Sequence, residues 1–152
     1  GQVGWTFHEA KAGDQPGKEF AYKAGNIRTI VVPAGRNVVL AGFDNARTAY
    51  PFTIEAGKRS EHVVVLIAGI ANFAAVGAGG EPVKGYKTWA VHKAQPDGKT
   101  KQVAFKSGYK PSFVLPAGRY QMQLGHDKRI YTADFEVKEG ATANFTVTVP
   151  KP

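Results

Sequence analysis

The chain has 152 residues with 20 Lys and Arg against 12 Asp and Glu, a formal net charge of +8. This charge favours acidic polymers such as polysaccharides, but no run of five basic residues occurs, and nucleic acid is not expected as a partner. The other interpretation is a basic surface that only keeps the protein in solution. Cysteine is absent, which excludes disulfides and a cysteine nucleophile.

Strand patterns begin at the first residues, where no secretory signal is recognised, so we expect a mature product or an excised piece. In the first half, apolar and polar residues alternate between turn residues from Gln2 to Leu66, and no window has a helical period. The apolar stretch Val63 to Ala78 is too short to cross a bilayer as a helix, so we predict no transmembrane segment. We predict instead two buried strands joined near Gly69.

The second half shows the same alternation more cleanly. Its strands are predicted at 70–76, 86–94, 102–106, 112–115, 119–124, 130–138 and 141–149. Trp89 and Val91 share one face, whereas His92 lies on the other. About seven short strands at this spacing are typical of a β-sandwich.

The two halves repeat each other with an offset of 83, which brings Pro33-Ala34-Gly35 onto Pro116-Ala117-Gly118. With one gap, Trp5 and His8 also match Trp89 and His92. The repeat predicts an all-β protein of two tandem Ig-like or transthyretin-like β-sandwich domains, residues 1–68 and 69–152. The first domain lacks a counterpart of 70–76. Either this strand is dispensable in the first domain, or the chain was cut from a longer array, or another chain supplies the strand. We expect the first domain to have an edge that is open or filled by a partner.

The segment Phe113-Val114-Leu115-Pro116-Ala117-Gly118-Arg119-Tyr120 resembles the turn signature of carboxypeptidase regulatory-like (transthyretin-like) and related bacterial Ig-like domains, and 135–140 resembles the strand and turn that follow it. The first copy departs at Asn37, where the second has Tyr120. The resemblance implies an extracytoplasmic protein (periplasmic, cell-surface or secreted) whose domains act as spacers, assembly modules or ligand-binding modules without catalysis. It implies no fixed binding residues.

Matched polar residues are the first candidates for a binding site. His8 and His92 are candidate ligand-binding or metal-binding residues, or else histidines on a solvated sheet face, and neither has a second ligand at zinc spacing. Arg36 and Arg119, just after the Pro-Ala-Gly turns, are candidates for holding an anion, or else solvated turn residues. We predict no metal and no cofactor.

Aromatic residues are the second group of candidates. Trp5 and Trp89 are expected inside the sandwich. The candidates for an exposed sugar-stacking platform are Tyr22, Tyr50, Tyr86 and Tyr109. His62 aligns with Phe145 and is expected at a core or edge position, whereas the matched Asp44 and Asp127 suit turns.

No catalytic motif is present: the sequence has no Gly-x-Ser-x-Gly, no phosphate-binding glycine loop and no His-Glu-x-x-His. We therefore predict a non-catalytic structural or interaction module of a bacterial exported protein, whose partner is another protein or a neighbouring domain. The alternative is a module that binds carbohydrate or an acidic polymer.

Overall fold

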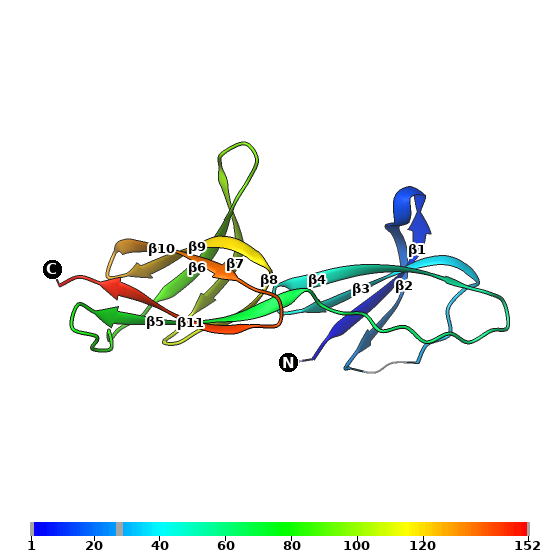
Figure 1. The fold of residues 1–152 in the computed structure, drawn as a ribbon, viewed down its shortest axis with the longest axis horizontal. Helices are drawn as coiled ribbons and strands as arrows, with labels where there is room; N and C mark the ends of the chain where they lie inside the picture. The colour runs from blue at the N-terminus through cyan, green and yellow to red at the C-terminus, as the bar shows by residue number, and fades with distance from the viewer. Residues whose placement is uncertain (1, 27–28, 152) are drawn as a thin grey trace. The chain divides into compact units, whose positions relative to one another are not determined.

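The computed structural model describes residues 2–26 and 29–151, and the chain divides into two compact units, Gly1–Ile67 and Ala68–Pro152 (Figure 1). The predicted all-β class is confirmed, because the described residues form eleven strands and a single turn of 3-10 helix, η1 (Ala12–Asp14). Each unit contains one of the two tryptophans, Trp5 or Trp89.

Unit 2 has seven strands in two sheets, as the alternation predicts. One sheet has the order β10-β9-β6-β7 and the other the order β11-β5-β8. The strands are β5 (Ala68–Gly77), β6 (Thr88–Ala94), β7 (Thr100–Ser107), β8 (Ser112–Pro116), β9 (Gly118–His126), β10 (Arg129–Val137) and β11 (Thr142–Val149). Strand β5 lies in the middle of its sheet, parallel to β11 and antiparallel to β8.

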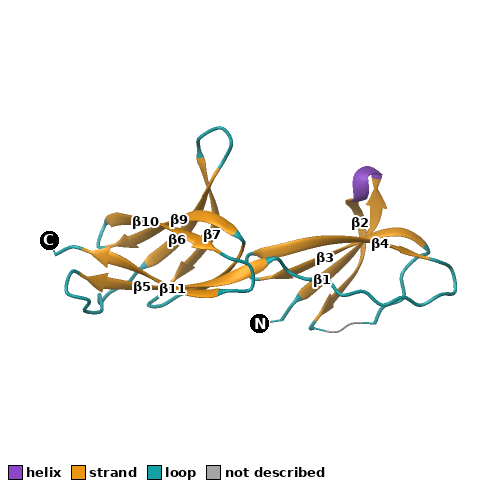
Figure 2. Ribbon diagram, viewed as in Figure 1, coloured by secondary structure: helices purple, strands orange, loops and turns teal. Residues whose placement is uncertain are grey.

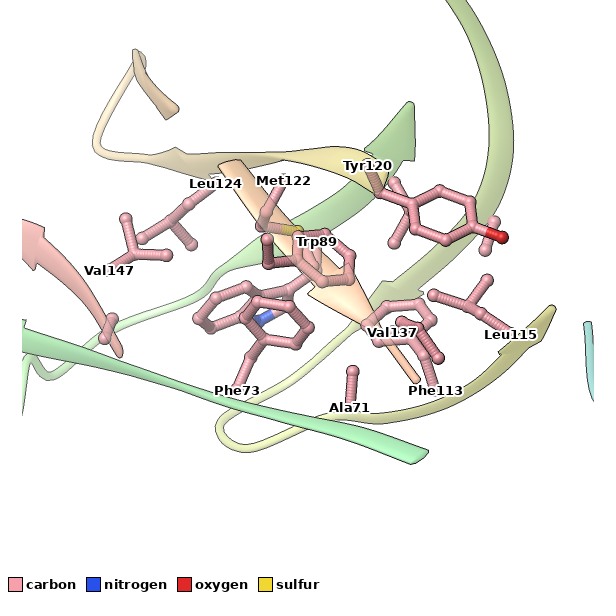
Figure 3. Close-up of a cluster of buried hydrophobic side chains, with 14 of the residues drawn as sticks. Ala71, Phe73, Trp89, Phe113, Leu115, Tyr120, Met122, Leu124, Val137 and Val147 are labelled. Atoms are coloured by element: carbon pink, nitrogen blue, oxygen red, sulfur yellow. The ribbon is translucent and has the colours of Figure 1, made fainter. Parts of the chain in front are cut away.

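The core of unit 2 is built from the inward residues of both sheets (Figure 3). Phe73 of β5 occupies its centre: its ring lies 4.9 Å from that of Phe135, 5.4 Å from Phe145 and 6.0 Å from both Trp89 and Phe113. On β5, β9 and β11, alternate residues are buried or partly buried, which is the pattern the sequence predicts for two packed sheets.

The described residues of unit 1 form one four-stranded sheet with the order β2-β1-β3-β4. Its strands are β1 (Gly4–Lys11), β2 (Gln15–Ala24), β3 (Gly35–Phe43) and β4 (Ala46–Ile54). They correspond to β6, β7, β9 and β10 and are paired in the same order. The core is small: Phe7, Val39 and Phe52 are buried, and the residues packed against them are only partly covered.

The second layer of unit 1 differs from that of unit 2. Residues 29–33 and 59–66 align with β8 and β11, but 29–33 and 59–67 pair with no strand among the described residues, and both are drawn as loop in Figure 2. The physical reason is that β8 and β11 pair with β5 and not with each other, and nothing within the described part of unit 1 takes the place of β5.

The predicted pair of strands joined near Gly69 is wrong. Residues 63–67 form no ladder, and Gly69 lies inside the continuous strand β5. A Cβ atom at Gly69 would lie 2.3 Å from the carbonyl oxygen of Lys138. Glycine is needed there because another part of the backbone approaches closely, and not because the chain turns.

Local hydrogen bonds explain why particular residues recur in both halves. The indole of Trp89 donates to the carbonyl oxygen of Gly108, and that of Trp5 donates to the equivalent Gly25. Both glycines have a left-handed backbone, with φ of 122° at Gly108 and 111° at Gly25, which a residue with a Cβ rarely adopts.

A hydrogen bond to the matched carbonyl oxygen also explains the mismatch between Asn37 and Tyr120. The Tyr120 hydroxyl donates to the carbonyl oxygen of Pro116 at 2.6 Å, and Asn37 Nδ2 donates to the matched carbonyl of Pro33 at 2.9 Å. Burial raises the pKa of Tyr120, so the hydroxyl stays a donor at neutral pH. Two different side chains therefore close the same Pro-Ala-Gly turn.

Truncating the central aromatic tests how far unit 2 depends on β5. We expect Phe73→Ala to lower the free energy of unfolding of unit 2 by about 3–5 kcal/mol, because it empties the centre of the core. With 5-fluorotryptophan at both tryptophan positions, the ¹⁹F signal of Trp89 reports on unit 2 and that of Trp5 on unit 1 during urea titration. The exposed Ile130→Ala is the control, with an expected change within about 0.5 kcal/mol. An unchanged midpoint for Trp89 would contradict this account of the core.

Candidate functional site

A shallow hollow of about 520 Å³ lies on the outer face of the sheet β10-β9-β6-β7 of unit 2. It brings together two of the candidates from the sequence, His92 and Arg119. The other residues that line it are Ala94, Thr100, Tyr120, Gln121, Asp134, Phe135 and Glu136. His92 points outward because Trp89 and Val91, of opposite parity on β6, are completely buried.

The register of the strands places the polar residues of the hollow in rows. His92 is opposite Gln121, which is opposite Asp134, and Arg119 is opposite Glu136. The two carboxylates and the guanidinium give the hollow both signs of charge. Such a surface can hydrogen-bond a polar ligand, but it has no bias towards anions alone.

His92 is half-buried, and its Nδ1 has no hydrogen-bond partner among the described residues. The matched His8 is also half-buried, but its Nδ1 donates to the carbonyl oxygen of Gly17 at 2.9 Å, and its Nε2 lies 3.0 Å from Thr6 Oγ1. Each histidine follows an irregularity in pairing, between Phe7 and His8 and between Val91 and His92. The two positions therefore share the same irregularity in strand pairing but differ in side-chain environment.

The two arginines also differ. Arg36 Nε and Nη2 donate to the two carboxylate oxygens of Asp14, both at 2.9 Å, and Nη1 donates to Thr53 Oγ1 at 3.1 Å. This bidentate bond lowers the pKa of Asp14 and raises that of Arg36. Arg36 is thus occupied by the chain's own carboxylate. Arg119 makes no comparable ion pair within the described residues.

The four tyrosines do not form one platform. Tyr86 and Tyr109 are 74% and 51% exposed on two loops of unit 2, which are joined by the bond from Gly108 N to Lys87 O. Tyr22 lies exposed on β2, and Tyr50, in β4, is half-buried beside His62. Of the four candidates, Tyr86 and Tyr109 are the two that lie on loops joined by a hydrogen bond.

A buried lysine supports these two loops. Lys87 is 1% exposed, its Nζ donates to the carbonyl oxygen of Gly85 at 2.8 Å, and it lies 5.5 Å from the ring centroid of Tyr109. Burial lowers its pKa. Sequence reasoning missed Lys87, although it has the inward parity of Trp89 and Val91.

The residues of the hollow on β10 were also missed. Asp134 and Glu136 alternate with Phe135 and Val137, so the alternation alone puts them on the outer face. What the alternation does not give is the register that sets them beside Gln121 and Arg119.

Exposed apolar side chains also gather in unit 1, on residues 29–33 and 59–67, which we call the open layer. Val31 is 96% exposed and Val63 is 83% exposed. Ile30, Val32 and Val64 face the sheet but are only partly buried. Their counterparts Phe113, Leu115 and Val147 are buried in the core of unit 2.

His62 belongs to this open layer. Its ring lies 5.5 Å from those of Tyr50 and Phe52, and its nitrogens lie within 3.0 Å of Tyr50 Oη and Ser60 Oγ. The expected inward direction is therefore observed. The side chain is nevertheless exposed, because no strand among the described residues pairs beside it as β5 pairs beside Phe145.

The described residues contain no group of three or more His, Asp or Glu that could hold a metal ion. None of the helices in the part of the chain described is long and apolar enough to span a membrane.

Comparison with known proteins shows no matching family model and no similar curated protein. Three solved structures align over 99% of the chain: the Bacillus anthracis TIE protein (17% identity, TM-score 0.43), the Streptococcus agalactiae minor pilin GBS52 (13%, 0.41) and a leucine-rich repeat protein of Bacteroides thetaiotaomicron (12%, 0.34). The chain spans 31% of the TIE protein structure, 83% of the GBS52 structure and 24% of the third.

The bond between Arg36 and Asp14 can be tested by titration. We expect Arg36→Gln to raise the pKa of Asp14 towards its ordinary value, because the largest cause of its lowering is the hydrogen bond from Arg36. Any stability from this bond is present above the unfolded pKa of aspartate and is lost as pH falls through the lower folded value. Carboxyl ¹³C NMR gives the pKa directly. Lys58→Gln removes the same charge and leaves the bond intact, and an equal shift in both variants would contradict the assignment.

Proposed function

We propose that this chain is a non-catalytic structural and interaction module of an exported or cell-surface protein. Unit 2, with its seven strands and filled core, acts as a rigid spacer, and unit 1 binds a protein partner through the open layer. The observation that carries the proposal is that the apolar residues 30–32 and 63–67 lie in segments, 29–33 and 59–67, that pair with no strand among the described residues.

The sequence of the open layer supports this role. Residues 62–67 read His-Val-Val-Val-Leu-Ile, with no charge, proline or glycine. Such a run strongly favours β-structure, and exposed runs of this kind drive aggregation unless something covers them. Free edges are usually protected by lysine, proline or bulges, and this run has neither lysine nor proline.

We also propose that both units belong with the carboxypeptidase regulatory-like and bacterial Ig-like domains, and that the protein works outside the cytoplasm. The support for the first is the turn chemistry that both halves share: Asn37 and Tyr120 close equivalent turns, and Trp5 and Trp89 bond equivalent glycines.

A proline double variant tests the partner-binding role of the open layer. Successive N–H groups of a strand point to opposite sides, so Val63→Pro/Leu66→Pro removes one donor on each side. Neither donor pairs with a strand in unit 1, so the variant should fold. A displayed library of random linear peptides is selected on the wild type. The enriched peptides should bind this variant at least tenfold more weakly, and bind Val63→Thr/Leu66→Met, which keeps both donors, as well as the wild type. No enrichment, or equal binding to all three, would contradict the proposal.

A second candidate function is binding of an acidic polysaccharide. It is favoured by Tyr86 and Tyr109, exposed on adjacent loops, and by Lys110, whose Nζ lies 5.4 Å from the ring centroid of Tyr109. Aromatic rings stack on sugars, and a nearby ammonium attracts their carboxylates or sulfates.

Heparin and neutral dextran serve as probes for this second function. We expect Tyr86→Ala/Tyr109→Ala to weaken heparin binding at least tenfold in moderate salt, because the stacking surface is lost. The control, Tyr22→Ala, removes an exposed tyrosine of unit 1 and should change nothing. Heparin binding that disappears in moderate salt, or that both variants keep, would indicate attraction by net charge alone.

A further inference from the structure

The open layer has a template for its occupant in the same molecule. Strand β5 of unit 2 pairs along its length with β11, from Ile70–Thr142 to Gly77–Val149, and with β8 from Ala68–Pro116 to Asn72–Ser112. The counterparts of β11 and β8 in unit 1 are 59–66 and 29–33. The place of β5 between them is taken by none of the described residues of unit 1.

Resting on the proposed function, we infer that unit 1 binds an extended strand supplied by a second polypeptide, which takes the place of β5. It runs parallel to 59–66 and antiparallel to 29–33. By the register of unit 2, its residue equivalent to Asn72 lies beside Glu61 and Thr29. The main chain supplies the ladder of hydrogen bonds, and alternate side chains give selectivity.

The pocket for the central residue can be specified. In unit 2 the ring of Phe73 contacts Trp89, Phe113, Phe135 and Phe145. The matched residues in unit 1 are Trp5, Ile30, Phe52 and His62, three apolar side chains and one imidazole. Phe52 is buried, but Trp5 and Ile30 are only partly buried and His62 is exposed. An aromatic residue at the centre of the incoming strand completes this cluster.

The neighbours of that residue must be small. On β5 the inward positions on either side of Phe73 are Ala71 and Ala75, both buried. The outward positions of the strand face different neighbours in the two units. Beside Ala74 and Val76 lie Thr146 and Thr148 in unit 2, but Val63 and Val65 take these places in unit 1. The ligand is therefore a strand with small, aromatic, small residues inward and β-branched residues outward.

The strand is not borrowed from a second copy of β5. That strand carries the centre of the core of unit 2, so its release would dismantle the larger core to complete the smaller one. A partner chain that presents a free segment of this pattern has no such cost. The partner is thus defined by an exposed apolar β-strand, and not by its charge.

The experiment uses the full chain and a synthetic peptide with the sequence of β5, Ala68 to Gly77, followed by two lysines for solubility. With both tryptophans replaced by 5-fluorotryptophan, we expect the ¹⁹F resonance of Trp5 to shift saturably and that of Trp89 to stay. Hydrogen exchange should slow in 29–33 and 59–66. Moderate salt should leave the affinity within about threefold, since the contacts are apolar and main-chain.

Two matched peptides separate the causes. The Phe73→Ala peptide should bind at least tenfold more weakly, because it leaves the central pocket empty. The Asn72→Pro peptide should bind at least tenfold more weakly, because residue 72 lies between two neighbouring strands and proline there removes one N–H donor from the ladder. Equal binding of all three would overturn the inferred site.

The remaining outcomes are also decisive. An unchanged Trp5 resonance, or protection confined to the edges β2 or β7, would overturn the inference. If the β5 peptide fails to bind but library peptides still bind the open layer, the inferred strand is wrong and the proposed function still holds. If no peptide binds the open layer, both the inferred strand and the proposed function are contradicted. The last test uses a fusion variant in which the β5 sequence is placed before Gln2. The linker is residues 78–87, which join β5 to β6 in unit 2. A fused strand that seats while the free peptide does not bind would overturn a second polypeptide as the source.

Discussion

The insertion of β5 between β8 and β11 is the interaction on which the second layer of this fold depends. Two strands that do not touch each other become a sheet only when a third lies between them, because every backbone donor and acceptor on their facing edges needs a partner. The same strand brings Phe73 to the centre of the core. Hydrogen bonding and apolar burial are therefore gained together or not at all.

The first sheet of each unit is independent of this event. In each unit the sheet contains two antiparallel pairs of consecutive strands, β1–β2 and β3–β4 in unit 1 and β6–β7 and β9–β10 in unit 2. The two pairs are joined by the antiparallel pairing of β1 with β3 in unit 1 and of β6 with β9 in unit 2. The features that both halves repeat serve this sheet: the tryptophan-to-glycine bond, the closed Pro-Ala-Gly turn and the left-handed aspartates, with φ of 52° at Asp44 and 50° at Asp127. These local hydrogen bonds and turn conformations are present in unit 1 even though its second layer is incomplete.

This division explains what the sequence could predict. The strands of unit 2 and the inward set on β10 and β11 follow from alternation, since burial on one face imposes a period of two. The repeat also predicts the missing strand. The sequence does not show that 59–67 lacks a ladder, because Val63, Val64 and Val65 carry a strong strand pattern whether or not a partner is present. Propensity is local, whereas pairing is not.

The candidate residues show the same limit. His92 and Arg119 meet in one hollow because their strands are neighbours in register, while Arg36 is occupied by Asp14 from η1, a contact that no alignment of the two halves displays. Repetition of a residue type thus predicts its backbone setting better than its chemistry. Asn37 is the converse: a different side chain performs the same bond as Tyr120.

The asymmetry between the units has a thermodynamic consequence. Unit 2 contains its own central strand, so its second sheet and its core are complete without an added strand. Unit 1 keeps its sheet, but the cluster that faces the open layer has three buried residues, Phe7, Val39 and Phe52. A ligand that binds the folded form therefore adds stability in proportion to the logarithm of its concentration above Kd. A strand that takes the place of β5 would fill the core as well as complete the ladder, so its binding and the ordering of unit 1 would be a single equilibrium.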